Sequence, residues 1–288
     1  MQMSIDKKIS LIIVSYNSSE NINKLLLSIK RYIYINIDEI IIIDNNSKDI
    51  DDMNIEDPKI KLIKNNKNYG FAKAVNQGID KSKNDFILLL NPDTIIINNS
   101  ILKTIKLVVN DKNIGVIGGK IKYEYKKIFT ANNTPTFLTG LFEFTNLKKM
   151  LPRNKYILDF WPEKNQKITQ PLEVSGICGA YMVFRKYDKI GNKNYFDENY
   201  FLYLEDLDFC LNIKSKGFKV IFDPRSEIFH VGGASSNNKY HMSLNYWYKS
   251  RKIFFKKHLN KVEGIILNII FTIEEIFLKT RLLIKNHD

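Results

Sequence analysis

The chain has 288 residues, 44% of them hydrophobic, which is enough for one large domain or two small ones around a sizeable core. Its net charge of +13 favours an anionic partner such as a nucleotide or a phospholipid surface, but the lysines are spread without a long basic block, so a nucleic-acid groove is not indicated. No stretch reaches the roughly 18 apolar residues of a spanning helix, and Cys178 and Cys210 lack zinc-site spacing, which favours reduced cysteines in the core of a cytosolic protein.

Apolar runs alternate with helical patterns through the first 120 residues. Runs rich in Ile, Leu and Val predict buried strands at residues 9–15, 39–43, 60–63, 86–90 and 116–118. The segments between them predict helices at residues 17–33, 68–81 and 100–109. Continuous apolar strands that alternate with helices indicate an α/β fold with a mostly parallel sheet, covered by helices on both faces.

Polar clusters follow three of these strands directly: Ser15-Tyr16-Asn17, Asp44-Asn45 and Asn91-Pro92-Asp93. In open parallel sheets, ligands bind in the crevice at the carboxyl ends of the strands. The alternative is that these are ordinary polar loops. Because each cluster comes immediately after an apolar strand, we favour a shared binding crevice.

The second half of the chain is less regular at first. Residues 120–170 carry prolines among aromatic side chains and lysines, and we predict a long connection with a binding role. The small residues 176–180, which permit close approach of a ligand to the backbone, precede a predicted strand at 181–184. Two further strands are predicted, at 220–222 and at a run ending within 228–233.

Three acids, Glu205, Asp206 and Asp208, lie within an aromatic and aliphatic run at residues 199–210. Burying a carboxylate is costly unless it is paired, bonded to metal or protonated, so such a cluster is a candidate for acid–base chemistry. The alternative is a helix start, where acids in the first turn interact favourably with the helix dipole.

Two helices end the chain. Residues 240–258 predict a helix rich in aromatic and basic side chains. Residues 264–284 predict a strongly apolar helix interrupted by charges, which either docks on the body of the protein or lies on a membrane surface.

Taken in order, these motifs resemble family 2 glycosyltransferases with the GT-A fold, especially a bacterial rhamnosyltransferase-like branch. The resemblance covers about residues 10–258. The motifs that carry it are Val14-Ser15-Tyr16-Asn17, Ile43-Asp44-Asn45-Asn46-Ser47, Asn68-Tyr69-Gly70-Phe71-Ala72 with Asn76 and Gly78, Asn91-Pro92-Asp93, Gly179-Ala180, Glu205-Asp206-Leu207-Asp208 and His230.

The resemblance implies a GT-A catalytic domain over residues 1–235 and a C-terminal helical segment over 236–288. Residues 1–119 would bind a nucleotide-diphosphate sugar, a UDP- or dTDP-sugar, and residues 120–235 the acceptor. Asp44 would accept a hydrogen bond from the nucleobase imide. The implied donor-binding residues are Ser15, Tyr16, Asn17, Asp44, Asn46, Gly70, Asn76, Asn91 and Asp93.

A divalent cation, Mg²⁺ or Mn²⁺, is also implied, held by Asp93 and His230 on the donor's diphosphate. Asp93 resembles the last acid of the family's Asp-x-Asp motif, but Asn91 replaces the first acid. One carboxylate binds metal less tightly than two, which puts strict metal dependence in question.

The implied reaction is an inverting transfer in which Asp206 is the catalytic base and Glu205 and Asp208 support it. The expected acceptor is a glycan or lipid-linked hydroxyl in bacterial surface polysaccharide synthesis. The expected location is cytoplasmic, with peripheral contact to the inner face of the cell membrane through the last helices. The alternatives are a non-catalytic sugar-nucleotide-binding subunit of a synthesis complex and a sugar nucleotidyltransferase.

Overall fold

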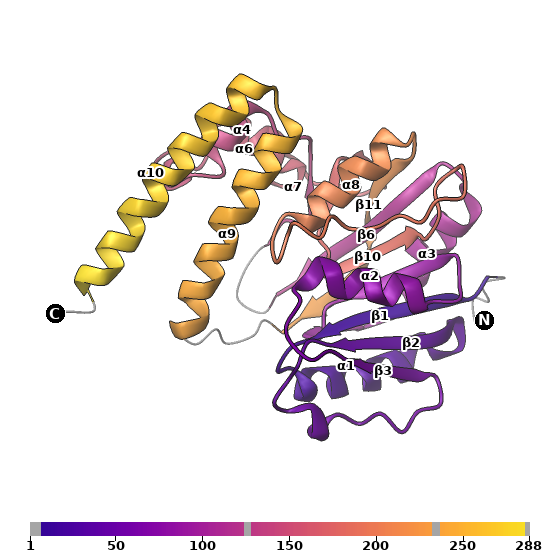
Figure 1. The fold of residues 1–288 in the computed structure, drawn as a ribbon. Helices are drawn as coiled ribbons and strands as arrows, with labels where there is room; N and C mark the ends of the chain where they lie inside the picture. Colours follow the sequence, from indigo (N-terminus) through magenta and orange to yellow (C-terminus); the bar gives the residue numbers. More distant parts are fainter. Residues whose placement is uncertain (1–6, 124–127, 232–236, 286–288) are drawn as a thin grey trace.

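The computed structural model describes residues 7–123, 128–231 and 237–285. A central sheet lies between helices, and the last two helices pack beside one end of it (Figure 1). The strands are β1 (Ile9–Ser15), β2 (Ile37–Asp44), β3 (Ile60–Lys64), β4 (Phe86–Leu90), β5 (Thr94–Ile95), β6 (Ile114–Lys122), β7 (Ala131–Asn132), β8 (Leu172–Val174), β9 (Gly176–Ile177), β10 (Tyr181–Arg185) and β11 (Lys219–His230). The α-helices are α1 (Ser19–Tyr32), α2 (Phe71–Lys81), α3 (Ile101–Asn110), α4 (Phe137–Phe142), α5 (Leu147–Met150), α6 (Lys155–Phe160), α7 (Pro162–Asn165), α8 (Glu205–Ser215), α9 (Asn237–His258) and α10 (Lys261–Lys285).

The sheet is parallel through its first half. Strands β3, β2, β1 and β4 lie side by side in the same direction, and β6 and β11 form another parallel pair. Strand β10 lies antiparallel between β4 and β6. The predicted α/β fold with a mostly parallel sheet is confirmed.

The reversed direction of β10 decides where the second half of the chain meets the first. Because β10 runs opposite to β4, the residues that precede β10 lie at the carboxyl end of β4. The backbone N–H of Asn91, just after β4, donates to the carbonyl of Ala180 at 3.1 Å. The small-residue segment 176–180 therefore lies at the same edge as the polar strand ends.

Buried strands distribute their side chains to two core clusters, as alternation along a strand requires. On β1, Leu11 and Ile13 pack with the buried side chains of α1 and α3. Ile12 and Val14 point to the other face and pack with α2 and α8. Both faces of the sheet are thus filled, which leaves the strand ends for a site.

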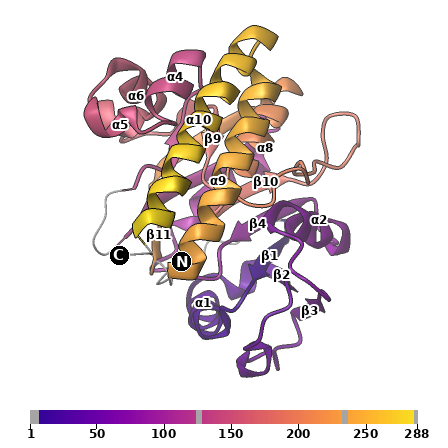
Figure 2. The ribbon, with the colours of Figure 1, turned by 60° about the vertical axis from the view of Figure 1, so that its left-hand side comes forward.

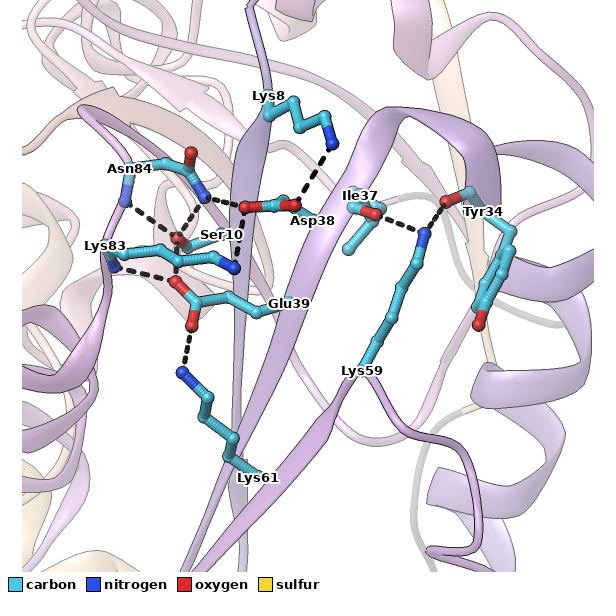
Figure 3. A network of polar contacts seen from close by, with 10 residues as sticks. All are labelled: Lys8, Ser10, Tyr34, Ile37, Asp38, Glu39, Lys59, Lys61, Lys83 and Asn84. Atoms are coloured by element: carbon cyan, nitrogen blue, oxygen red, sulfur yellow. Dashed lines mark hydrogen bonds and ion pairs between the residues drawn. The ribbon is translucent and has the colours of Figure 1, made fainter.

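A polar network ties the strands together at their amino ends (Figure 3). The buried carboxylate of Glu39 accepts hydrogen bonds from the Ser10 hydroxyl at 2.6 Å, the Lys61 ammonium at 2.6 Å and the Lys83 backbone N–H at 2.7 Å. Burial alone would raise the pKa of Glu39, but these partners outweigh it and hold the pKa below its usual value. These contacts at the amino ends of the strands are therefore structural, and the two cavities described below lie at the carboxyl ends.

One long strand replaces two predicted ones. The sequence predicts strands at 220–222 and within 228–233, whereas β11 runs through both as far as residue 230. Its pairing with β6 shifts register between Asp223 and Glu227, beside Pro224, which has no N–H to donate. This bulge has the sequence character of a turn, which explains the error. Residues 232 and 233 lie outside the described residues.

The segment 120–170, predicted to be irregular, contains the four short helices α4 to α7 within its described part. Each is too short to show a helical period in the sequence. Phe144, between α4 and α5, and Phe160 of α6 pack with Phe254 and Phe255 of α9 and Phe271 of α10 in a third, largely aromatic cluster. Figure 2 shows α9 and α10 lying side by side, with α4 to α6 next to them. Within the described ranges, no helix combines the length and apolar character needed to cross a membrane.

Candidate active site

Two cavities adjoin at the carboxyl ends of the strands. The strand-end cavity, of about 340 Å³, lies among residues that follow β1, β2 and β4. The aromatic cavity, of about 350 Å³, is lined by the start of α8 and by rings from the 120–170 segment and α9. Phe71, Asn91 and Leu202 line both, so the two cavities share a wall.

The strand-end cavity brings together five of the predicted donor-binding residues. Tyr16 and Asn17 come from the end of β1, Asn91 and Asp93 from the end of β4, and Gly70 from the start of α2. These positions are up to 77 residues apart in sequence, from Tyr16 to Asp93, and the parallel sheet aligns them. The predicted crevice therefore exists as a cavity.

Asp44 lies behind the wall of this cavity. Its side chain is buried, and its carboxylate accepts hydrogen bonds from the Ser47 backbone N–H at 2.9 Å and from the Ser47 hydroxyl. The Ser47 hydroxyl oxygen in turn accepts the backbone N–H of Asn17 at 2.8 Å. Asp44 thus holds the loop that presents Asn17, and its contact with a nucleobase stays a prediction.

Ser15, Asn46 and Asn76 are not among the residues that line either cavity in the described part of the chain. Ser15 is buried, Asn46 is exposed with a φ of +65°, and Asn76 is buried under the loop before α8. The Asn76 side chain donates to the Phe196 carbonyl at 2.9 Å and accepts the Phe196 N–H at 2.9 Å. Asn76 therefore supports the loop that precedes α8.

Asn45 lines the strand-end cavity although it was not predicted as a site residue. Its buried amide donates to the Gly70 carbonyl at 3.2 Å and accepts from Asn65 at 3.0 Å. Gly70 has a φ of +86°, and a Cβ there would lie 2.6 Å from the Phe201 carbonyl oxygen. The signal for Asn45 was present, since it belongs to the polar cluster that follows β2.

Asp93 and His230 meet from opposite halves of the chain. The His230 Nε2 lies 3.2 Å from the Asp93 Oδ1, and the His230 ring stacks on Tyr123 with centroids 4.6 Å apart. Burial lowers the pKa of His230, although the Asp93 charge acts in the opposite direction. A neutral imidazole is the form that binds metal.

No group of three or more His, Cys, Asp or Glu side chains arranged for a metal ion occurs among the described residues. The predicted pair, Asp93 and His230, offers two ligands, and Asn91 lines the strand-end cavity together with Asp93. Mg²⁺ commonly keeps several waters and binds one or two carboxylates together with substrate phosphates. The residues present therefore fit a cation that is shared with a phosphate-bearing ligand.

Glu205 and Asp206 open α8 on the wall of the aromatic cavity. The Asp206 carboxylate accepts the backbone N–H groups of Gly179 at 2.9 Å and Leu207 at 2.8 Å. Burial nevertheless raises the pKa of Asp206. Glu205 is 6% exposed, and its Oε2 has no hydrogen-bond partner within the described ranges. Burial and the Asp206 charge raise the pKa of Glu205 to about 8.

Asp208, the third acid, lines neither cavity in the described structure and faces α9. Its buried carboxylate lies 2.6 Å from the His258 Nε2 and 2.9 Å from the Lys257 Nζ, and it accepts the Tyr200 hydroxyl at 3.2 Å. Its contribution in this geometry is to fasten α8 to α9.

The chain enters α8 through strained backbone. Tyr203 and Leu204 have φ values of +74° and +66°, a region that costs about 1 kcal/mol or more for residues other than glycine. Helix α9 holds them: the Tyr203 hydroxyl lies 2.5 Å from the Ser243 hydroxyl, and the Ser250 hydroxyl donates to the Leu202 carbonyl at 2.7 Å. Strain at this point, beside the buried Glu205 and the partly buried Asp206, is typical of a functional site.

Aromatic rings line a large part of the aromatic cavity. They come from the 120–170 segment and from α9, and the sequence did not single them out: Phe129, Phe144, Phe160, Trp161 and Trp247. Such rings present flat apolar faces as well as polar edges. The binding role of the 120–170 segment stays a prediction. Rings of this segment line the aromatic cavity.

The two adjoining cavities share a wall, and one of them is lined by Glu205 and Asp206. Residues 10–190 match the family described as Glycosyl transferase family 2, so the chain belongs to this family and is a glycosyltransferase. The predicted family and enzyme class are confirmed.

Curated relatives include two rhamnosyltransferases. The chain is 23% identical over 209 residues to N-acetylglucosaminyl-diphospho-decaprenol L-rhamnosyltransferase of Mycobacterium tuberculosis, covering 68% of this chain and 67% of the relative. It is 24% identical over 213 residues to rhamnosyltransferase WbbL of Escherichia coli K12, covering 68% and 76%. It is 23% identical to poly-beta-1,6-N-acetyl-D-glucosamine synthase of Staphylococcus aureus, of which it spans 48%.

Solved structures support the same fold. A mannosyltransferase, PcManGT of Pyrobaculum calidifontis in complex with GDP-Man and Mn²⁺, matches with a TM-score of 0.56 at 14% identity, over 88% of this chain and 64% of that one. GalNAc-T7 with UDP, GalNAc and Mn²⁺ matches with a TM-score of 0.57 at 15% identity, over 91% and 54%. At these identities the similarity establishes the fold, and the predicted GT-A fold is confirmed.

Proposed function

We propose that the enzyme moves a sugar from a nucleotide-diphosphate donor in the strand-end cavity to a hydroxyl of an acceptor in the aromatic cavity, with inversion at the anomeric carbon. The observation that carries this proposal is the shared wall. Asp93 lines one cavity, Asp206 lines the other, and Asn91 lines both. A donor and an acceptor in these cavities would meet at that wall.

Asp206 is the proposed catalytic base. As the acceptor oxygen bonds to the anomeric carbon, the bond from that carbon to the diphosphate breaks, and the hydroxyl proton passes to the Asp206 carboxylate. Burial raises the pKa of Asp206, which makes it a stronger base, while the N–H groups of Gly179 and Leu207 keep its ionised form available. Asp208 supports the position of Asp206 by fastening α8 to α9.

The donor is proposed to be a UDP- or dTDP-sugar. Tyr16, with 49% of its side chain exposed in the cavity wall, can lie against a nucleobase, and Asn17 and Asn91 offer amide groups to the ribose and phosphates. Asp44 would contact the base imide after the Ser47 hydroxyl turns away. Structural neighbours crystallised with GDP-Man or UDP support a nucleotide ligand for this fold.

A divalent cation, Mg²⁺ or Mn²⁺, is proposed at Asp93 and His230. When bound, it would neutralise charge on the departing nucleotide diphosphate. The neutral imidazole of His230 and the carboxylate of Asp93 lie within reach of one ion, and the two neighbours solved with Mn²⁺ support the choice. Asn91 would add an amide oxygen where the family motif has an acid.

The acceptor is proposed to be a glycan, or a lipid-linked glycan of bacterial surface polysaccharide synthesis. Sugar rings have apolar faces that pack on aromatic side chains and hydroxyls that need polar partners. Trp161 and Trp247 supply such faces, and Glu205 and Asp206 supply polar atoms beside them. The relatives named for a diphospho-decaprenol acceptor and for a polysaccharide support this class of acceptor.

The test is transfer by the full chain from a panel of UDP- and dTDP-sugars with Mn²⁺ to lipid-linked and soluble glycans. We expect Asp206→Asn to lower transfer by about 10²- to 10⁴-fold, because a positioned general base is worth that much. Donor binding, followed by thermal shift, should persist in this variant. Near-normal transfer by folded Asp206→Asn would remove Asp206 as base. Pyrophosphate release from a nucleoside triphosphate would instead identify a nucleotidyltransferase, and binding without any turnover a non-catalytic subunit.

A further inference from the structure

One face of α10 is apolar and exposed along most of its length. We call this set the apolar stripe; its exposed fractions run from 42% for Ile266 to 66% for Phe277. Its members recur at intervals of three or four residues, which aligns them on one side of a helix. They are Val262, Ile265, Ile266, Ile269, Ile273, Ile276 and Phe277.

The other face of α10 is fixed to the protein. Leu267 and Phe271 are buried in the aromatic core cluster. Glu274 receives the Arg251 guanidinium at 2.6 Å and the Asn146 backbone N–H at 2.6 Å. Turning the apolar stripe inward would break this buried ion pair, which is costly. The buried contacts of α10 therefore fix its orientation so that the apolar stripe faces outward.

The border of the apolar stripe is mainly cationic. Lys256 of α9 lines a groove of about 420 Å³ with Ile265 and Ile269. By helix geometry, the exposed side chains of Lys261 and Lys279 flank the same stripe; Lys279 also forms an ion pair with Glu275 at 2.6 Å, next to the stripe. Glu263, in the first turn, is its acidic neighbour. A row of apolar side chains bordered by lysines is complementary to a partner whose interior is apolar and whose surface carries negative charge.

We infer that the apolar stripe of α10 docks on an anionic lipid bilayer, with the apolar side chains in the acyl boundary and the lysines against phosphate groups. An in-plane amphipathic helix with a basic border binds in this way, through buried apolar area together with charge attraction. A second copy of the chain is disfavoured as the occupant, because each copy carries a net charge of +13 and the same border lysines. This inference does not depend on which sugar or acceptor the enzyme uses.

Vesicle flotation with the full chain tests the inference. The wild-type chain should float with vesicles of phosphatidylglycerol and phosphatidylcholine, bind pure phosphatidylcholine more weakly, and lose binding as salt increases. The variant Ile269→Glu/Ile273→Glu should bind the anionic vesicles about tenfold or more weakly, since two apolar contacts are lost and two negative charges gained.

The matched control is Leu27→Glu/Ile190→Glu, which makes the same charge change at side chains 69% and 84% exposed elsewhere on the molecule. It should keep wild-type binding, and both variants should keep the wild-type melting temperature. Failure of the wild-type chain to float, or equal binding by the two variants, would overturn the inference. A wild-type dimer in sedimentation that Ile269→Glu/Ile273→Glu converts to monomer, with vesicle binding unchanged, would assign the apolar stripe to self-association instead.

Discussion

Two neighbouring acids at the start of α8 are given different properties by their surroundings. Asp206 receives two backbone N–H groups, whereas the Oε2 of Glu205 receives no hydrogen bond from the described residues. Hydrogen bonds favour a carboxylate and burial disfavours it. The pKa of Glu205, raised to about 8, keeps the proton on Glu205 at neutral pH. A protonated Glu205 can donate a hydrogen bond into the aromatic cavity.

Replacing Glu205 with Gln should make folding stability less sensitive to pH. The folded-state pKa of Glu205 is raised to about 8 from an ordinary value of 4.5, so the unfolded chain releases this proton first. The contribution of Glu205 to stability is complete below about pH 4.5 and is lost as pH rises toward about 8, by a few kcal/mol in order of magnitude. Gln cannot ionise, so Glu205→Gln should be more stable than wild type near pH 8 and similar near pH 5, measured by urea unfolding. An unchanged pH slope would contradict the assignment.

At the scale of elements, the contact between α8 and α9 holds the site together. Asp208 is 1% exposed and faces His258 and Lys257 on α9, while Tyr203 and Leu204 are held in strained backbone by the same helix. A strained turn persists only where the surrounding structure enforces it. We therefore expect the position of Asp206 to depend on α9.

Replacing Asp208 with Asn should test that dependence. The change removes the carboxylate that His258 and Lys257 face, and because Lys257 is 38% exposed and partly solvated, we expect a loss of about 1–3 kcal/mol. Lys257 keeps its second partner, Asp197, so we expect a value near the lower end. Denaturant unfolding measures the loss, and transfer activity should fall because α8 loosens.

The matched control for that change is Asp80→Asn. Asp80 forms a pair of similar length, 2.6 Å, with Lys193, but its side chain is 50% exposed. An exposed pair contributes about 0–1 kcal/mol, so this variant should unfold almost as wild type does. Equal effects of the two substitutions would show that α8 is not held by Asp208.

Sequence periodicity captured the elements that are regular and local. β1, β4 and α2 were predicted nearly to their ends, because continuous apolar runs and helical spacing are properties of a single segment. The bulge at Pro224 and the short helices α4 to α7 were missed, because a bulge resembles a turn and four to six residues show no period. The rings that line the aromatic cavity were missed for another reason: Trp161 and Trp247 come to line one cavity only through tertiary packing.

The residues of the candidate site also fall into those that the sequence could predict and those that it could not. Tyr16, Asn17, Asn91 and Asp93 could be predicted, because each follows a strand and a parallel sheet aligns strand ends. The orientation of Asp208 toward α9 could not be predicted. An acid in the first turn of a helix does not reveal which side of that helix packs on a neighbouring element.

At the scale of the whole molecule, the two C-terminal helices connect the aromatic cavity with the apolar stripe. α9 supplies Trp247 to the aromatic cavity, and α10 carries the apolar stripe. Lys148, just after Asn146, lines the aromatic cavity, and the Asn146 backbone bonds Glu274 of α10. The wall of the proposed acceptor cavity is therefore tied to the proposed membrane-facing helix, an arrangement suited to an acceptor carried on a lipid. The predicted boundary at residue 236 stays a prediction, but the two parts share this cavity.

The longest-range pair in the site, Asp93 with His230, supports a last prediction. Asp93 lies between β4 and β5, His230 ends β11, and the two side chains meet only in the folded sheet. A donor at about 100 times its dissociation constant stabilises a protein by about 2.7 kcal/mol, so a metal-assisted donor should raise the melting temperature more with Mn²⁺ than without it. In Asp93→Asn the extra shift from Mn²⁺ should disappear while the metal-free shift remains. The exposed control Asp51→Asn should keep both shifts.

Two outcomes would contradict this prediction. An undiminished Mn²⁺ shift in Asp93→Asn would show that Asp93 does not hold the cation. Equal shifts of the wild-type chain with and without Mn²⁺ would show that the enzyme binds its donor without metal, which would agree with Asn91 in place of the family's first acid.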